Sequence, residues 1–508
     1  MPRRVLVIGL DGGTMRLLGP LMAAGVMPEL ARLMQQGCHG ELRSTFPPLT
    51  PPAWSAFMTG KNPGKHGVVS FRRAPKGYRT GDFINARTLR ARTLWEIVGD
   101  AGYTVGAMHV VPSYPVRPVN GFMVSCMLSP PGAKDIIYPP EFRALLGDDY
   151  VISLEPPTQL AVTDPTYRQK ALDYVGRLRQ LGRRRLEAAL RLVRERPCDL
   201  LAVIFYEPDR VQHFFWKDMD PHHPRHTAEG AALFANAIHD VWVRDDQILG
   251  DLLAALPPDA TVMMLSDHGF DAIYRQVNLA NWLPKTDMPH WLATLAVPKM
   301  MMTNGLVHHW LQGQVPGSSD REVFIDKFID LCKNLQDPQT GVHPFESLFR
   351  REDIYSGRMV EKAPDVVFQE SPKYYVTKGN ADSTGLPTIQ DIWSTSFSAH
   401  HRPQGILAIR SPNVHVPTQG TLRERLAKGG DFKDAHIIDV SPTLLALMQQ
   451  IIPDDMDGRV LQEAITQEFL TQHPPQTGHV EGFLLDRLPP SKLTPEEREK
   501  LKALPYLQ

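Results

Sequence analysis

The chain of 508 residues has no apolar run that approaches the ~20 residues of a membrane-spanning helix. Its first apolar run, residues 5–10, is too short for the core of a signal peptide and is not followed by a small-residue cleavage site. The cysteines are few, far apart and without a CxxC pair: Cys38, Cys126, Cys198 and Cys332. We therefore expect a soluble, cytoplasmic protein with reduced thiols and no cysteine metal site.

An excess of one charge is also missing. The 55 Lys and Arg residues nearly balance the 56 Asp and Glu residues, and the formal net charge is −1 at pH 7. This balance gives no electrostatic reason to expect a nucleic-acid polymer or an anionic membrane as the main partner. Hydrophobic residues make up 42% of the chain, so a large core can form.

Short apolar runs alternate with helical patterns, which is typical of a parallel sheet covered by helices. The clearest expected strands are Val5–Leu10, Thr104–Val110, Leu200–Tyr206, Thr261–Ser266 and Ile406–Arg410. Several are apolar on both faces, as central parallel strands are. Residues 167–196 have apolar side chains at near-helical spacing and contain nine arginines, which favours a helix with a solvated face over an anion-binding surface.

Five short motifs follow a strand or begin a helix, where ligands bind in open α/β sheets. Asp11 comes directly after the first strand and before two glycines. Thr50 precedes Pro51 and Pro52, which suit the first turn of a helix, and a helix N-terminus favours an anion. A loop-capping aspartate and an ordinary N-cap threonine are the alternatives for these two residues.

The next two motifs each combine a carboxylate with an imidazole. Asp209 and His213 are four residues apart, so one helical turn would place both on the same face. Asp267 and His268 are adjacent on a tight turn after a strand. Carboxylate oxygen and imidazole nitrogen are usual zinc ligands, although a chance Asp-x-x-x-His pair and a surface turn are the competing interpretations.

The fifth motif contains His400 and His401, which chemistry alone does not tell apart. Together the motifs supply three carboxylates, three imidazoles and one hydroxyl at strand ends. A two-metal phosphoryl-transfer site needs this set, because metal ions lower the pKa of a hydroxyl nucleophile and neutralise charge on the leaving oxygen.

The order and spacing of the motifs resemble the alkaline phosphatase superfamily. The most similar branch groups type I phosphodiesterases and nucleotide pyrophosphatases with predicted bacterial phosphohydrolases and phosphomutases. Its nucleophilic Thr stands nine residues before a Thr-Gly and its motif ends in Pro-x-x-His-Gly, as residues 50–67 do here. Its Asp-x-x-x-His, Asp-His-Gly and His-Arg motifs match residues 209–213, 267–269 and 401–402, and the resemblance covers most of the chain.

This resemblance implies a three-layer α/β/α sandwich with a mostly parallel central sheet and an inserted cap. It implies Thr50 as the nucleophile and two divalent metal ions. One ion would be bound by Asp11, Thr50, Asp267 and His268, and the other by Asp209, His213 and His401. Zinc is the usual metal of the branch, while manganese or magnesium serves some relatives. Arg402 and Lys61 are candidate contacts to the phosphoryl group.

The chain is expected to divide into four parts. Residues 1–270 and 396–465 form the core, and residues 271–395, where the regular alternation breaks down, form a cap that contributes substrate contacts. Residues 466–508 form a polar C-terminal tail. The tail ends in a short helix that starts at Thr494.

The expected activity is hydrolysis of a small-molecule phosphate ester through a phospho-threonine intermediate, with a phosphodiester favoured over a monoester. Nucleotide pyrophosphatases have an Asn three residues after the nucleophile, where this chain has Ala53, so nucleotide specificity does not follow. A phosphotransferase or mutase at the same site and a metal-binding pseudoenzyme are the alternatives. A sulfatase is excluded because the Cys/Ser-x-Pro-x-Arg motif is absent. The oligomeric state is not indicated.

Overall fold

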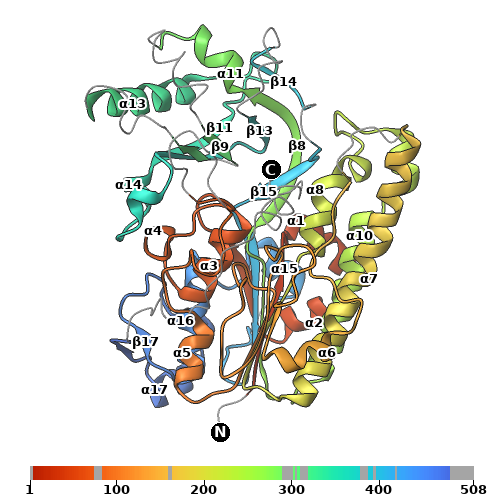
Figure 1. Cartoon of the computed structure of the whole chain (residues 1–508), viewed down its shortest axis with the longest axis vertical. Coiled ribbons are helices and arrows are strands. Elements are labelled where there is room, and N and C mark those ends of the chain that lie inside the picture. Colours follow the sequence, from red (N-terminus) through yellow and green to blue (C-terminus); the bar gives the residue numbers. More distant parts are fainter. Residues whose placement is uncertain are drawn as a thin grey trace.

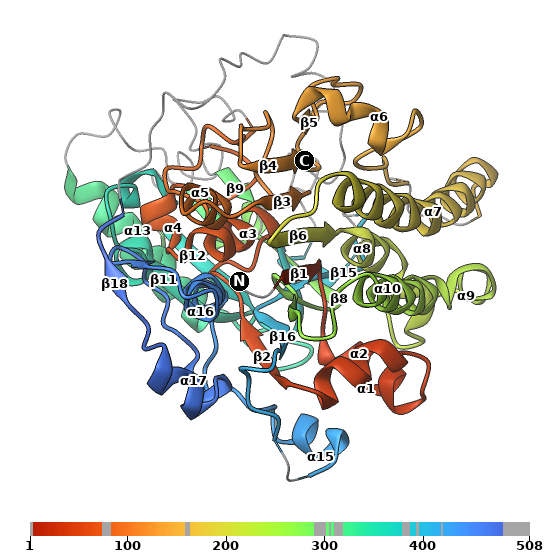
Figure 2. The ribbon, with the colours of Figure 1, turned by 90° about the horizontal axis from the view of Figure 1, so that it is seen from below.

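An eight-stranded sheet forms the centre of the computed structural model, with strand order β2–β16–β7–β1–β6–β3–β4–β5 (Figures 1 and 2). Strands β7, β1, β6, β3 and β4 are parallel, while β16 and β5 run antiparallel to their neighbours. The strand bounds are β1 Val5–Leu10, β2 Cys38–Arg43, β3 Val105–Met108, β4 Gly121–Val124, β5 Ile137–Tyr138, β6 Leu200–Phe205, β7 Thr261–Leu265 and β16 Gln404–Arg410. The structure describes residues 4–73, 83–157, 163–288, 301–303, 306–308, 318–377, 387–392, 396–417 and 420–480.

Helices bury both faces of the sheet because its central strands are apolar on both sides. Val5 and Val7 of β1 pack into the core on one face, and Leu6 and Ile8 pack into the core on the other. The first face is covered by α3 Thr50–Thr59, α4 Pro63–His66, α5 Leu94–Asp100 and α16 Val440–Leu447 (Figure 1). The second is covered by α1 Met15–Ala23, α2 Pro28–Gln35, α6 Arg143–Leu146, α7 Pro165–Glu195, α8 Glu207–Met219 and α10 Ala237–Ala254. The expected α/β/α sandwich with a mostly parallel sheet is confirmed.

Element ends differ from the sequence prediction where a local conformation decides them. Strand β3 stops at Met108, before the expected Val110, because His109 adopts a left-handed φ of 67° that ends an extended strand. Helix α7 begins at Pro165, two residues before the expected start, because the Asp164 side chain accepts hydrogen bonds from the first backbone amides.

The segment between β7 and β16 forms two smaller sheets and a hydrophobic core of its own. One sheet has the order β11–β12–β10–β9, and the other joins β13, β8, β14 and β15. The bounds are β8 Gly269–Asn278, α11 Leu279–Trp282, β9 Met301–Thr303, β10 Leu306–His308, α13 Ser318–Asn334, β11 Phe345–Arg350, α14 Arg351–Ile354, β12 Val366–Glu370, β13 Lys373–Thr377, β14 Ile389–Asp391 and β15 Ala399–Arg402. Strand β8 runs continuously across residue 271, so the core and the expected cap share a strand.

The remaining α-helices and strands are short and lie mostly at the periphery. They are α9 Ala228–Phe234, α15 Leu422–Ala427, α17 Gln467–Gln472, β17 Ile452–Pro453 and β18 Thr477–Gly478. The helix expected at Thr494 lies outside the described residues. The four cysteines are buried and unpaired. In the described part of the chain, no one helix has the length and apolarity to span a membrane, although the bent pair α1–α2 meets both criteria together.

Most arginines of α7 form the expected solvated face. Arg179 and Arg183, for example, are exposed and pair with Asp240 and Asp251 of α10. Arg185 is the exception, because its side chain is 0% exposed and its guanidinium donates to the Glu207 carboxylate at 3.1 Å. Since Glu207 begins α8, this ion pair fixes the helix that carries Asp209 and His213.

Replacing Arg185 by Met should therefore destabilise the fold by about 3–5 kcal/mol, because the Glu207 carboxylate would stay buried without its partner. The measurement is the free energy of unfolding in urea. The matched control is Arg183→Met on the exposed side of the same helix, which should change stability by about 0.5 kcal/mol or less. Equal effects of the two substitutions would contradict this account of Arg185.

Candidate metal and catalytic site

The five sequence motifs meet at the carboxyl ends of the three neighbouring strands β7, β1 and β6, beneath the insertion. The structure brings together seven of the nine predicted site residues, and all seven are buried: Asp11, Thr50, Asp209, His213, Asp267, His268 and His401. They come from β1, α3, α8, the β7–β8 turn and β15. Ligands bind at this edge in open α/β sheets.

Local conformation places the carboxylates and the hydroxyl. After Asp11 the chain turns at Gly12, with φ +78°, where a Cβ atom would lie 2.9 Å from the Gln212 side chain. The Gly12 amide donates to Asp267 Oδ1 at 3.3 Å, which ties the ends of β1 and β7 together. Thr50 begins α3, so its hydroxyl lies at the positive end of the helix dipole.

The start of α3 has fewer free backbone amides than an ordinary helix N-terminus, which leaves less to bind an anion than expected from the sequence. Pro51 and Pro52 have no amide hydrogen, and the Ala53 amide donates to the Leu49 carbonyl at 3.0 Å. The prolines fix the helix geometry, but they leave the Thr50 amide as the donor of the first turn. Stabilisation of an anion here must therefore come mainly from other groups.

Asp11, Asp267 and His268 form a first group around the Thr50 hydroxyl. His268 Nε2 lies 3.5 Å from Asp11 Oδ1 and 3.2 Å from Asp267 Oδ2. The same nitrogen lies 3.3 Å from Thr50 Oγ1. One ligand atom from each of Asp11, Asp267 and His268 lies within 4.8 Å of the others, a spacing that can enclose one cation.

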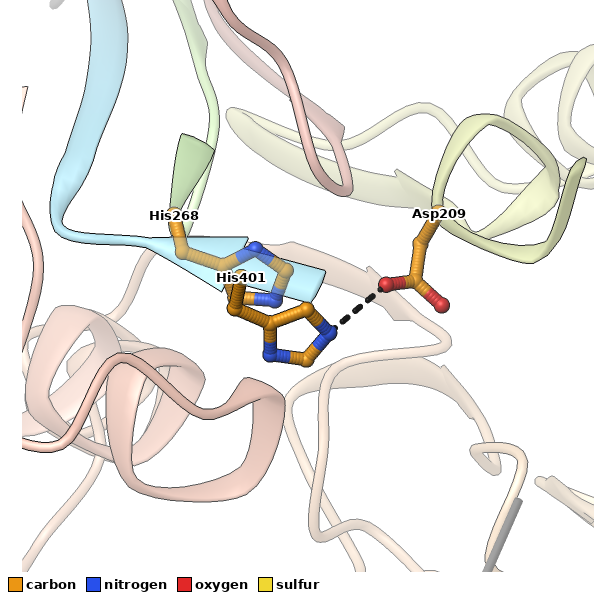
Figure 3. Close-up of side chains that lie close together, drawn as sticks. All are labelled: Asp209, His268 and His401. Carbon is orange, nitrogen blue, oxygen red and sulfur yellow. Dashed lines mark hydrogen bonds and ion pairs between the residues drawn. The ribbon is translucent and has the colours of Figure 1, made fainter. Parts of the chain in front are cut away.

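Asp209, His213 and His401 form a second group beside the first. Asp209 Oδ1 lies 3.0 Å from His401 Nε2 (Figure 3). It lies 3.3 Å from His213 Nε2, and the two imidazole nitrogens are 3.0 Å apart. The rings of His401 and His268 stack with centroids 3.6 Å apart. His268 is thus within reach of both groups. One ligand atom from each of Asp209, His268 and His401 also lies within 4.8 Å of the others.

Each of the three imidazoles is oriented by a backbone carbonyl that its Nδ1 atom contacts. The Nδ1 atoms of His213, His268 and His401 lie 2.9, 3.2 and 2.9 Å from the carbonyl oxygens of Ala399, Gly269 and Pro48. Donation from Nδ1 to these carbonyls leaves each Nε2 as an acceptor that faces the cluster. Metal-binding histidines are oriented in this way in known sites.

Two of the three carboxylates, Asp11 and Asp267, are not compensated by the protein. Burial raises the pKa of Asp11, as does the charge of Asp267, and burial together with Asp209 raises the pKa of Asp267. Burial acts to raise the pKa of Asp209 too, but His213 and His401 hold it well below its usual value. Asp11 Oδ1 and Asp267 Oδ2 are buried with no hydrogen-bond partner among the described residues. Two orphaned oxygens that face imidazole acceptors fit the donor set of a divalent cation.

His400 and His401 have separate surroundings. His401 Nε2 lies in the cluster, whereas His400 Nδ1 accepts the His401 backbone amide at 2.8 Å and its ring lies 5.5 Å from that of Tyr375. The alternation of side chains along β15 therefore places the second of the two imidazoles, His401, beside Asp209.

The two predicted phosphoryl contacts are not at the cluster. The Arg402 guanidinium donates to the Glu346 carboxylate at 2.6 Å and to the Glu370 carbonyl at 2.5 Å, both in the insertion. Lys61 lies just past the C-terminal end of α3 and pairs with Asp455 at 2.5 Å. At a rise of 1.5 Å per residue, that end is about 15 Å from Thr50. Both were named from the sequence as cations that could contact the phosphoryl oxygens, but a sequence does not show where a long side chain finds its partner.

Other residues that support the cluster were not singled out from the sequence. The buried Trp54 indole donates to Asp11 Oδ2 at 3.2 Å, and the Gln212 amide donates to the Gly12 carbonyl at 2.9 Å. Trp54 stands one helical turn after Thr50, so it lies on the same helix face. That spacing could have predicted from the sequence that Trp54 lies beside the cluster. The side chain of Ala53 offers no polar atom to a phosphoryl group.

Known structures share this fold. Phosphonoacetate hydrolase from Sinorhizobium meliloti 1021, in complex with phosphonoacetate, matches with a TM-score of 0.53 and 15% identity over 87% of this chain and 94% of that one. Murine and human ectonucleotide pyrophosphatase/phosphodiesterase 5 match with TM-scores of 0.51 and 0.52 and 14% identity. These matches cover 91% and 93% of this chain and 100% and 99% of those chains. No curated protein matches by sequence.

The family model for type I phosphodiesterases and nucleotide pyrophosphatases matches residues 5–404. This range contains the cluster, Thr50 and the whole insertion, and it is well over half of the chain. The resemblance inferred from the motifs is thereby confirmed. The chain belongs to the type I phosphodiesterase/nucleotide pyrophosphatase family and is an enzyme that hydrolyses phosphoric esters.

Proposed function

We propose that the enzyme hydrolyses a small-molecule phosphodiester, with Thr50 as the nucleophile and with two divalent cations in the cluster. The observation that carries the proposal is the convergence of three carboxylates and three imidazole Nε2 atoms beside the buried Thr50 hydroxyl. Asp11, Asp267 and His268, with Thr50, would hold one cation. The second would be held by Asp209, His213 and His401.

The cations, when bound, supply a lowered pKa for the nucleophile and charge neutralisation around the phosphoryl oxygens. Zinc is the proposed metal because three imidazole nitrogens suit it, and manganese and magnesium, which carboxylates also suit, are the alternatives that the metal titration below compares.

Residues of the chain position the reaction. Thr50 Oγ1, which is hydrogen-bonded to His268 Nε2, forms a bond to phosphorus while the bond from phosphorus to the leaving alcohol breaks. The alcohol departs with one proton. A water molecule then cleaves the phospho-threonine ester, which releases a phosphomonoester and restores the Thr50 hydroxyl. The rigid start of α3, fixed by Pro51 and Pro52, holds Oγ1 in line for attack.

The placement of cationic side chains supports a diester over a monoester. A monoester carries one more negative charge and would need more cations around its oxygens. Arg402 and Lys61 are instead held by Glu346 and Asp455. Two of the similar structures are complexes, that of phosphonoacetate hydrolase with phosphonoacetate and that of an inactive murine ectonucleotide pyrophosphatase/phosphodiesterase 5 with AMP, which supports a small phosphorus-containing molecule as the substrate. Because Ala53 offers no polar contact, the proposal does not extend to nucleotides.

Replacing Thr50 by Ala should reduce turnover of bis-p-nitrophenyl phosphate by on the order of 10³-fold or more, because it removes the hydroxyl that lies against His268 in the cluster. The wild-type enzyme should turn over this diester faster than p-nitrophenyl phosphate. Turnover and bound metal, by elemental analysis, are measured together, and the variant should keep its metal.

The matched control is Thr59→Ala, at the other end of the same helix, where the hydroxyl donates to the Ser55 carbonyl. This variant should retain turnover within a few-fold. Full activity of Thr50→Ala would show that another group is the nucleophile, and a preference for the monoester would remove the diester assignment.

Replacing Trp54 by Phe should weaken divalent-metal affinity by about 10–100-fold, because it removes the hydrogen bond that orients Asp11 while keeping the aromatic bulk. Calorimetric titrations of the metal-free protein with zinc, manganese and magnesium measure the change. Trp242→Phe is the matched control, since the Trp242 indole nitrogen is buried without a hydrogen-bond partner among the described residues. A similar loss of affinity in both variants would argue against a role of Trp54 in orienting Asp11.

A further inference from the structure

A second polar cavity lies at the opposite end of α3 from Thr50. Its volume is about 80 Å³, and four cationic side chains line it together with a single carboxylate: Lys61, Arg90, Arg92, Arg358 and Asp455. We call it the basic cavity. It lies on the side of the molecule where α4, α5 and β17 are found (Figure 1).

The charges of the basic cavity are only partly compensated within the protein. Lys61 pairs with Asp455 at 2.5 Å, and Arg92 pairs with Asp100. Neither Arg90 nor Arg358 has a carboxylate partner among the described residues. Two of the four cationic residues that line the cavity therefore have no carboxylate partner of their own, and the one lining carboxylate, Asp455, is paired with Lys61.

The burial of Lys61 makes this arrangement different from a surface cluster. Lys61 is only 8% exposed. Lysine is almost never fully buried unless it is paired, and Lys61 is paired with Asp455. Its partner Asp455 has a largely exposed side chain, so the ion pair is open to solvent on the carboxylate side. Like charges that converge at a partly desolvated site repel one another, and a bound anion relieves that repulsion.

Specific backbone contacts build the cavity from three parts of the chain. Gly60, with φ +64°, ends α3 and accepts the Asp457 amide at 2.8 Å, which brings the C-terminal segment against Lys61. The Arg90 amide donates to the His66 carbonyl at 2.9 Å. The Met359 amide donates to the Gly64 carbonyl at 2.8 Å and so places Arg358 of the insertion over the core.

We propose that the basic cavity binds a small tetrahedral oxyanion, either inorganic phosphate or the phosphate group of a small ester, which links Arg358 of the insertion to Lys61 and Arg90 of the core. Guanidinium groups bind phosphate oxygens in pairs of parallel hydrogen bonds. The volume is well below the ~300–1,000 Å³ of pockets that enclose drug-sized ligands, which selects a small anion. The site is distinct from the cluster, because α3 separates it from Thr50 by about 15 Å.

Calorimetric titration of the metal-loaded, full-length enzyme with inorganic phosphate tests this proposal. The wild-type protein should bind two equivalents, one at the cluster and one in the basic cavity. The Arg90→Gln/Arg358→Gln variant should bind one equivalent, or bind the second at least 10-fold more weakly. Its inhibition constant for phosphate in turnover assays should stay within about 2-fold of wild type, because that constant reports the cluster.

Two further variants separate a specific site from general charge effects. Arg179→Gln/Arg183→Gln removes the same charge from the exposed face of α7 and should still bind two equivalents. Arg358→Gln alone changes an exposed residue, so it should fold normally, as circular dichroism will show, and should weaken the second binding event. Retention of both binding events in the Arg90/Arg358 variant, or an equal loss in the α7 control, would overturn the proposal.

The source of the anion is resolved by a parallel titration with phenylphosphonate, which carries a tetrahedral oxyanion on an organic group. Binding of phosphate but not phenylphosphonate in the basic cavity assigns free inorganic phosphate. Binding of both assigns the phosphate group of a larger molecule whose remainder extends into solvent.

Discussion

Repulsion between buried carboxylates is the constraint on which the rest of this structure depends. Asp11, Asp209 and Asp267 are enclosed together at the end of three adjacent strands, where burial alone would favour their protonated forms. The sheet forces this proximity, because β7, β1 and β6 are held in register by apolar side chains on both faces. The fold thus provides free energy that keeps the site ready for cations, and any loosening of the strands would let the carboxylates separate.

The neighbouring groups relieve this repulsion only at Asp209, whose pKa His213 and His401 lower, while the pKa values of Asp11 and Asp267 stay raised. The imidazoles of His213, His268 and His401 direct acceptors toward the carboxylates, and their Nδ1 atoms are engaged by backbone carbonyls. Nearby cations such as Arg402 are held by acceptors of the insertion. A protein that neutralised its own carboxylates with arginine or lysine would have no need of metal ions, so the positions of these cations matter as much as those of the ligands.

Most of the core and the gathering of seven candidate residues were predictable because the signals are local. Each aspartate follows an apolar run, and parallel strands bring such positions to one edge. The roles of Lys61 and Arg402 were not predictable, because their partners are 394 and 56 residues away and no periodicity reports such contacts. The same holds for His109, whose left-handed backbone shortened β3, and for Arg185, which sequence alone groups with the exposed arginines of its helix.

Strand β8 connects the insertion directly to the candidate metal site. It begins directly after His268, pairs with β15 so that Phe270 lies opposite His401, and continues without a break into one of the two sheets of the insertion. A tilt of the insertion would therefore shift the imidazoles of both His268 and His401. Mutations that reshape the insertion would therefore also alter the spacing of His268 and His401, so the insertion and the candidate metal site would evolve together.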